Sequence, residues 1–278
     1  MNNVEQYTTA LSKPNAYWMA RIAGQIYTRE SDNNPAPDEV KILKNLKEED
    51  ENFIEIFGVS KNSAQAALIE HENYLCFAFR GTDEITDWLD NLNMFPERAI
   101  FGEFHRGFWN SVSDVWQELF EKYKTLKDRK KRPLFLTGHS LGGAMATIAA
   151  ARLIHMDLPF ISTYTFGQPR AMTLETSRIF NVEAKYRFFR FQNNNDIVTR
   201  LPSRIMSYSH VGSFLYISEE KKLYNDPGLW FRFLDSVDGT FTSFREMVEK
   251  NGGGRLDAIE DHDMKLYLDA IKQWNCDF

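Results

Sequence analysis

One short segment of this chain combines residue types that could do chemistry. Gly138-His139-Ser140-Leu141-Gly142 matches G-x-S-x-G, in which a serine sits on a tight turn from a strand into a helix. The apolar run 134–136 predicts a buried strand before the turn, and the Ala-rich run 144–153 predicts a buried helix after it. The glycines supply the side-chain-free neighbours that such a turn needs. The segment therefore predicts a serine nucleophile, exposed above a sheet at a helix N-terminus that can hold an oxyanion.

A serine nucleophile near neutral pH needs a histidine to take its proton and a carboxylate to orient that histidine. On folds that carry this motif between a strand and a helix, the three residues follow in the order serine, acid, histidine. Asp196 is the candidate acid, because it ends a polar run, 193–196, that follows the strand-like run 188–191. Weaker candidates lie in an aromatic-rich stretch, at Asp226 and Asp235.

Two of the six histidines follow Asp196, and either could be the base: His210 and His262. Spacing alone does not choose between them. His139, inside the motif, is expected to point away from the serine-facing side. The other three are assigned no catalytic role: His105 is interpreted as structural, and His71 and His155 as surface residues.

The elements that must position these residues alternate along the chain. Early strands are predicted at 53–59, 64–69 and 74–79, the first two joined by a hairpin at 60–63. A cover helix is expected at 15–29 and a second helix at about 106–125, with later strands at 162–166, 186–191 and 214–217. This order predicts an α/β fold, with a mostly parallel sheet, an antiparallel edge and helices on both faces. We expect a single domain over 1–278 with a cap-like insertion at about 218–260.

Composition narrows the classes of function. The net charge of −6 argues against nucleic acid as the partner. Two cysteines cannot build a disulfide framework, and Cys76 is expected to be a buried free thiol. No Cys/His cluster suggests a metal ligand set, and no cofactor is expected. The sequence shows no signal peptide and no apolar run of membrane-spanning length, so a cytoplasmic location is expected, with a secreted mature form left open.

Four separated segments resemble the class 3 lipases, the family of the fungal triacylglycerol lipases and their bacterial and plant relatives. The segments are 79–82 with 87–90, 105–108, 137–144, and 165–170 continuing to 195–202. Together they span about 74–217 in the order that the family has. The resemblance implies the α/β-hydrolase fold, with a lid helix over the site at about 83–95.

The resemblance also assigns site residues. His262 lies in 261–268, which is similar to the family's Asp-His-x-x-x-Tyr segment around the catalytic base, so His262 becomes the expected base and His210 the alternative. The oxyanion is expected to be held by the N–H groups of Leu141, which follows the nucleophile, and Thr82, which matches the family's oxyanion position. Lid and substrate contacts are expected from Ile85, Trp88 and Leu89, although a plain surface helix would show the same pattern.

These features predict a serine hydrolase that cleaves carboxylic esters of lipids through the triad Ser140, Asp196 and His262 and an acyl-enzyme. Acylglycerols, glycerophospholipids and galactolipids are the expected substrate classes, with transient contact at a membrane or lipid-droplet surface. Two alternatives stay open. One is a soluble esterase or acyltransferase without interfacial activation, and the other is a non-catalytic binding or signalling module on a lipase-like fold. The sequence does not indicate an oligomeric state.

Overall fold

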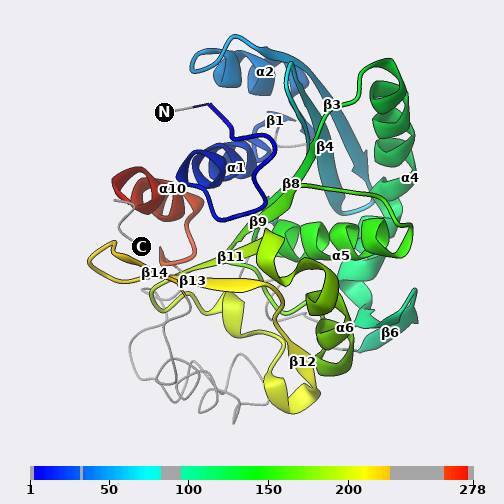
Figure 1. The fold of residues 1–278 in the computed structure, drawn as a ribbon, viewed down its shortest axis with the longest axis vertical. Helices are drawn as coiled ribbons and strands as arrows, with labels where there is room; N and C mark the ends of the chain where they lie inside the picture. The colour runs from blue at the N-terminus through cyan, green and yellow to red at the C-terminus, as the bar shows by residue number, and fades with distance from the viewer. Residues whose placement is uncertain (1–2, 32–33, 83–94, 226–259, 275–278) are drawn as a thin grey trace.

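The computed structural model describes residues 3–31, 34–82, 95–225 and 260–274. Its centre is an eight-stranded sheet (Figure 1). In chain order the strands of this sheet are β3 (Phe53–Lys61), β4 (Ala64–His71), β5 (Leu75–Phe79), β8 (Leu134–His139), β9 (Ser162–Phe166), β11 (Phe188–Asn193), β13 (Ser213–Ile217) and β14 (Leu223–Asn225).

The sheet is mostly parallel, as predicted. Its strand order is β14-β13-β11-β9-β8-β5-β4-β3, and the neighbours from β13 to β5 run parallel. The predicted hairpin is confirmed, because β3, β4 and β5 pair antiparallel at one edge. β14 adds a second antiparallel edge that the sequence did not predict.

Helices cover both faces of the sheet, as Figure 1 shows. One face carries α1 (Lys13–Gln25), α2 (Glu39–Lys47) and α10 (Met264–Gln273), and the other carries α4 (Arg106–Arg129), α5 (Leu141–His155) and α6 (Leu174–Ala184). Side chains alternate between the two faces along a strand. In β8, Leu134 and Leu136 join the core under α4 and α5, whereas Phe135 joins the core under α1.

Smaller elements flank the main sheet. A two-stranded sheet and a four-stranded sheet lie outside it, built from β1 (Arg29–Ser31) with β2 (Asn34–Pro37) and from β6 (Pro96–Ala99), β7 (Gly102–His105), β10 (Met172–Thr173) and β12 (Tyr208–Ser209). Three 3-10 turns follow α6 and β11, at Lys185–Arg187, Val198–Arg200 and Arg204–Met206. Within the described ranges, no helix combines the length and apolar character needed to cross a membrane.

Two local predictions were wrong. The cover helix ends at Gln25 rather than at 29, because the chain turns there and enters β1. His71 is buried rather than on the surface. Its ring contacts the Asp50 carboxylate at 3.1 Å, accepts a hydrogen bond from the Asn73 N–H and stacks on Tyr74. His155 is exposed and Cys76 is a buried free thiol, as predicted.

His105 begins α4 and is structural, as predicted. Its Nδ1 accepts a hydrogen bond from the Phe108 N–H at 3.4 Å, and the two rings stack with centroids 3.9 Å apart. Burial lowers the pKa of His105 from 6.5 to about 4. The unfolded chain therefore binds a proton at this residue between pH 6.5 and 4 that the folded chain does not bind.

Replacing His105 by asparagine removes this titration and keeps an oxygen acceptor suited to a helix N-cap. Because the folded-state pKa is depressed, the wild type should lose up to about 3 kcal/mol of unfolding free energy at this residue as the pH falls from 6.5 to 4. The His105→Asn variant should show a correspondingly shallower pH dependence. Urea unfolding of both proteins across this range measures the difference, and identical slopes would contradict the assignment.

Candidate active site

The serine lies on the turn that its motif predicts, between β8 and α5. Ser140 has φ 59° and ψ −133°, a left-handed backbone that a residue with a Cβ adopts only under strain. A Cβ at position 142 would lie 2.1 Å from the Phe79 carbonyl oxygen, so this turn needs glycine there. Ser140 was predicted to be exposed, but it is buried. Gly81 and the Tyr27 hydroxyl lie close to the turn.

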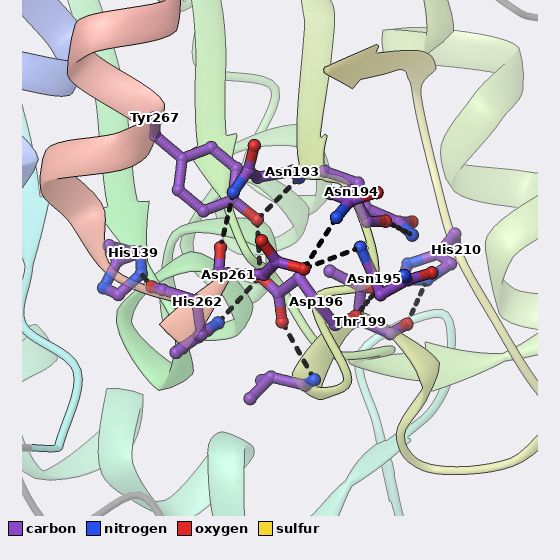
Figure 2. Close-up of polar contacts among 12 residues, drawn as sticks. His139, Asn193, Asn194, Asn195, Asp196, Thr199, His210, Asp261, His262 and Tyr267 are labelled. Carbon is purple, nitrogen blue, oxygen red and sulfur yellow. Dashed lines mark hydrogen bonds and ion pairs between the residues drawn. The ribbon is translucent and has the colours of Figure 1, made fainter. Parts of the chain in front are cut away.

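Asp196 follows β11 and is fully buried (Figure 2). One carboxylate oxygen accepts a hydrogen bond from the Val198 N–H at 2.9 Å. The other lies 2.8 Å from Nδ1 of His262 and also accepts a hydrogen bond from the Tyr267 hydroxyl. The structure therefore joins the predicted acid to His262.

The alternative base has other partners. The Nε2 of His210 donates to the Thr199 carbonyl oxygen at 2.7 Å, and in Figure 2 the ring lies on the far side of Asp196 from His262. Burial, and then the charges of Arg190 and Arg170, lower the pKa of His210 well below its usual value. No hydrogen bond links this ring to Asp196 among the described residues.

The segment before α10 is tied to the loop after β11. Both the Asn194 side chain and the Asn195 N–H donate to Asp261 Oδ2, at 3.0 and 3.1 Å. The Asn193 side chain donates to the Asp261 carbonyl oxygen at 2.9 Å. Sequence reasoning treated this asparagine run only as a polar loop, but its side chains hold the neighbour of His262.

Tyr267 is a further site residue that sequence reasoning left without a role. It lies on α10, and its hydroxyl oxygen accepts a hydrogen bond from the Asn193 N–H at 3.0 Å. The same hydroxyl group donates a hydrogen bond to Asp196. Burial, together with the neighbouring Asp196 carboxylate, raises the pKa of Tyr267 well above its usual value. A neutral tyrosine that donates to the acid completes the carboxylate's contacts.

Several buried side-chain polar atoms make no hydrogen bond among the described residues, and two of them belong to predicted site residues: Ser140 Oγ and His262 Nε2. A buried polar atom without a partner is destabilising, and such atoms are uncommon in folded proteins unless they have a role. In the predicted triad these are the two atoms between which the proton is exchanged. In proteins without substrate, such catalytic contacts are often long and tighten only when substrate binds.

A cavity of about 530 Å³ opens beside His262. Its lining includes Thr82, Tyr27, His139 and His262. The other lining residues lie on or next to α1 and α10: Arg21, Gly24, Gln25, Asp263, Met264, Lys265 and Leu268. Thr82 thus lies beside the expected base, and Leu141 begins α5 directly after the serine. The lid residues Ile85, Trp88 and Leu89, and residues 226–259 of the predicted insertion, lie outside the described residues.

Solved structures with a similar fold identify the fold class. One is described as a triacylglycerol lipase whose catalytic centre is a serine protease triad (23% identical, 76% of this chain and 82% of that one, TM-score 0.63). Another is the MDLA N225Q mutant of Penicillium cyclopium (24% identical, 73% and 78%, TM-score 0.62). At this identity the likeness shows the fold, which is the α/β-hydrolase fold.

Sequence comparison then points to one family. Residues 76–206 match the model of the lipase (class 3) family. The chain is 27% identical to a Rhizomucor miehei lipase over 233 residues, which are 79% of this chain and 59% of that lipase. It is also 27% identical to phospholipase A1-II 1 of Oryza sativa subsp. indica, over 70% of this chain and 56% of that protein. Over residues 76–206 the chain is therefore similar to the class 3 lipases, and it spans a little over half the length of these curated relatives.

Gly167 is a further residue of the site that the sequence did not single out. It follows β9 with φ +59°, and a Cβ there would lie 2.7 Å from His262 Nδ1 and 2.8 Å from Asp196 Oδ2. Only glycine leaves room for the contact between the acid and the base. Its signal in the sequence was a glycine directly after a predicted strand.

Gly167→Ala should therefore part Asp196 from His262. If these residues act in catalysis, kcat should fall by roughly 100-fold, as small displacements of catalytic groups commonly cause. Steady-state esterase kinetics, with thermal unfolding to show that the variant is folded, provide the measurement. A folded Gly167→Ala protein with wild-type kcat would mean that this contact has no part in the reaction.

Proposed function

We propose that this protein hydrolyses carboxylic esters of lipids through an acyl-enzyme on Ser140. The observation that carries the proposal is the buried contact between Asp196 and His262, together with a strained serine on the predicted turn whose hydroxyl makes no hydrogen bond among the described residues. Ser140 Oγ attacks the ester carbonyl carbon, and His262 Nε2 takes the serine proton. Asp196 orients the imidazole and stabilises its protonated form.

The oxyanion of the tetrahedral intermediate is held by the N–H groups of Leu141 and Thr82. When the intermediate collapses, the bond to the alcohol oxygen breaks and His262 gives that oxygen its proton. Water then attacks the acyl-enzyme with the same base, which releases the carboxylic acid and restores Ser140. These steps use only groups of this chain and a water molecule.

The relatives support lipids as the substrate class. They include proteins named as a lipase, a phospholipase A1, and a secreted mono- and diacylglycerol lipase from Penicillium cyclopium. We therefore propose acylglycerols or glycerophospholipids as substrates, and galactolipids as a further class. Residues 83–95 are proposed to form a lid, with Ile85, Trp88 and Leu89 facing the substrate during transient contact with a lipid surface.

The cavity between α1 and α10 is proposed to take the alcohol part of the ester. The general base must reach the leaving alcohol oxygen to protonate it, so the space that His262 borders lies on the alcohol side of the scissile bond. Polar side chains, including Arg21, Gln25 and Lys265, lie around this cavity. These side chains offer polar partners to the alcohol in a cavity whose lining is otherwise mostly apolar.

The triad is tested by substitution. Ser140→Ala and His262→Ala should each lower kcat on p-nitrophenyl esters by at least about 10⁴-fold, whereas His210→Ala should keep most of the activity. A series of acyl chain lengths separates lipase from esterase preference, and a fluorophosphonate probe should label the wild type but not Ser140→Ala. A wild type that cleaves no ester would favour a binding module. A dead His210→Ala with an active His262→Ala would reverse the base assignment.

The alcohol cavity is tested by filling it. Leu268→Trp, on α10, should lower kcat/KM about tenfold for esters of bulky polar alcohols. Methyl esters of the same fatty acid should be affected much less, because their alcohol needs little of this space. Competition between the two esters measures the ratio of their kcat/KM values directly. Equal losses on both esters would place the alcohol elsewhere.

A further inference from the structure

His139 connects two segments that are far apart in the sequence, contrary to the expectation that it points away from the site. Its Nδ1 lies 2.8 Å from the hydroxyl of Tyr27, just after α1, and its Nε2 lies 2.7 Å from the backbone carbonyl oxygen of His262. The rings of His139 and His262 are in contact, with centroids 4.5 Å apart and planes inclined by 33°. Figure 2 shows His139 beside His262, on the side away from His210.

The direction of both hydrogen bonds follows from the partners. A carbonyl oxygen can only accept a hydrogen bond, so Nε2 of His139 carries a proton and donates a hydrogen bond to the His262 carbonyl oxygen. Burial, and then the nearby His262, lower the pKa of His139 well below its usual value, so the ring is neutral. A neutral ring protonated at Nε2 has a lone pair at Nδ1. The Tyr27 hydroxyl therefore donates to His139 and fixes its tautomer.

His262 is thus held at two separate points. Asp196 holds its ring through Nδ1, and His139 holds its main chain through the carbonyl group. The residue lies before the first turn of α10, which begins at Met264, and among the described residues no helical hydrogen bond to this carbonyl is seen. A rotation of the main chain here would swing the imidazole away from the serine.

We propose that His139 is a positioning residue that sets the orientation of His262, and that Tyr27 acts through His139 by fixing its tautomer. The proposal rests on the proposed function, because it takes His262 as the base. It gives His139, which directly precedes Ser140, a role distinct from packing. It also makes the segment after α1 part of the active-site support.

Substitutions separate this role from packing. His139→Leu removes the donor and keeps an apolar side chain, whereas His139→Gln offers an amide N–H near the place of Nε2. We expect kcat to fall roughly 100-fold in His139→Leu, with KM little changed, and to return to within about tenfold of the wild type in His139→Gln. The rate of fluorophosphonate labelling should follow kcat. The control is His71→Leu, which removes another buried, hydrogen-bonded histidine and should lower thermal stability without lowering kcat.

A double-mutant cycle tests the path from Tyr27. Tyr27→Phe should lower kcat on its own and should cause little further loss in the His139→Leu background. Both changes break the same series of hydrogen bonds, from Tyr27 through His139 to the His262 carbonyl oxygen. Additive losses would mean that Tyr27 contacts the substrate directly, and would overturn its assigned role. Should His139→Leu fail to fold, Tyr27→Phe with His139→Gln completes the cycle, since both changes are conservative.

The outcomes also separate this proposal from the function on which it rests. A wild type without esterase activity overturns both. An active wild type with unchanged kcat in His139→Leu overturns the positioning role alone, and so does a loss of kcat in the His71→Leu control as large as that in His139→Leu.

Discussion

Asp196 places a carboxylate where no solvent reaches it, and a buried carboxylate is tolerated only when hydrogen-bond donors surround it. Its three partners come from different parts of the structure: the Val198 N–H from its own loop, His262 from the segment before α10, and Tyr267 from α10 itself. Leaving one such polar group unsatisfied typically destabilises a protein by about 1–3 kcal/mol. The hydrogen bonds to this side chain therefore help to fix where α10 docks, and with it where His262 lies.

The sheet supplies the rest of the geometry. β8, β9 and β11 are parallel neighbours, so their carboxyl ends meet at one edge. Ser140, Gly167 and Asp196 each follow one of these ends. Residues that are far apart in the chain thus become neighbours through strand pairing alone. The strained backbone of Ser140 and the close approach of Gly142 to Phe79 show how tightly the turn between β8 and α5 must pack to bring Ser140 to that edge.

Local patterns predicted most of the strands and helices, and the structure brings two of the predicted site residues, Asp196 and His262, into contact. Alternation of apolar side chains marked the strands, and the glycine-rich turn marked the nucleophile, because both are properties of neighbouring residues. Spacing could not separate His210 from His262, since both follow the acid. That choice depends on which ring reaches Asp196 across 66 or 14 residues of chain, a question of tertiary packing.

Tyr27, Gly167 and Tyr267 escaped for the same reason. Each matters through a contact with a distant segment: Tyr27 with His139, Gly167 with the acid–base pair, and Tyr267 with Asp196. His71 shows the converse error. A histidine in a polar stretch suggests the surface, but the partners that allow its burial, Asp50 among them, come from another part of the chain.

The position of α10 has a consequence for biosynthesis. This helix and His262 leave the ribosome after every described strand of the central sheet, whereas Ser140 and Asp196 emerge earlier. Until α10 docks, Asp196 lacks two of its donors and Ser140 lacks its proposed base. On the proposed mechanism, a nascent chain can therefore assemble its sheet with Ser140 already in place and still be inactive. Docking of one late helix then completes the environment of Asp196 and brings His262 into the site in the same event.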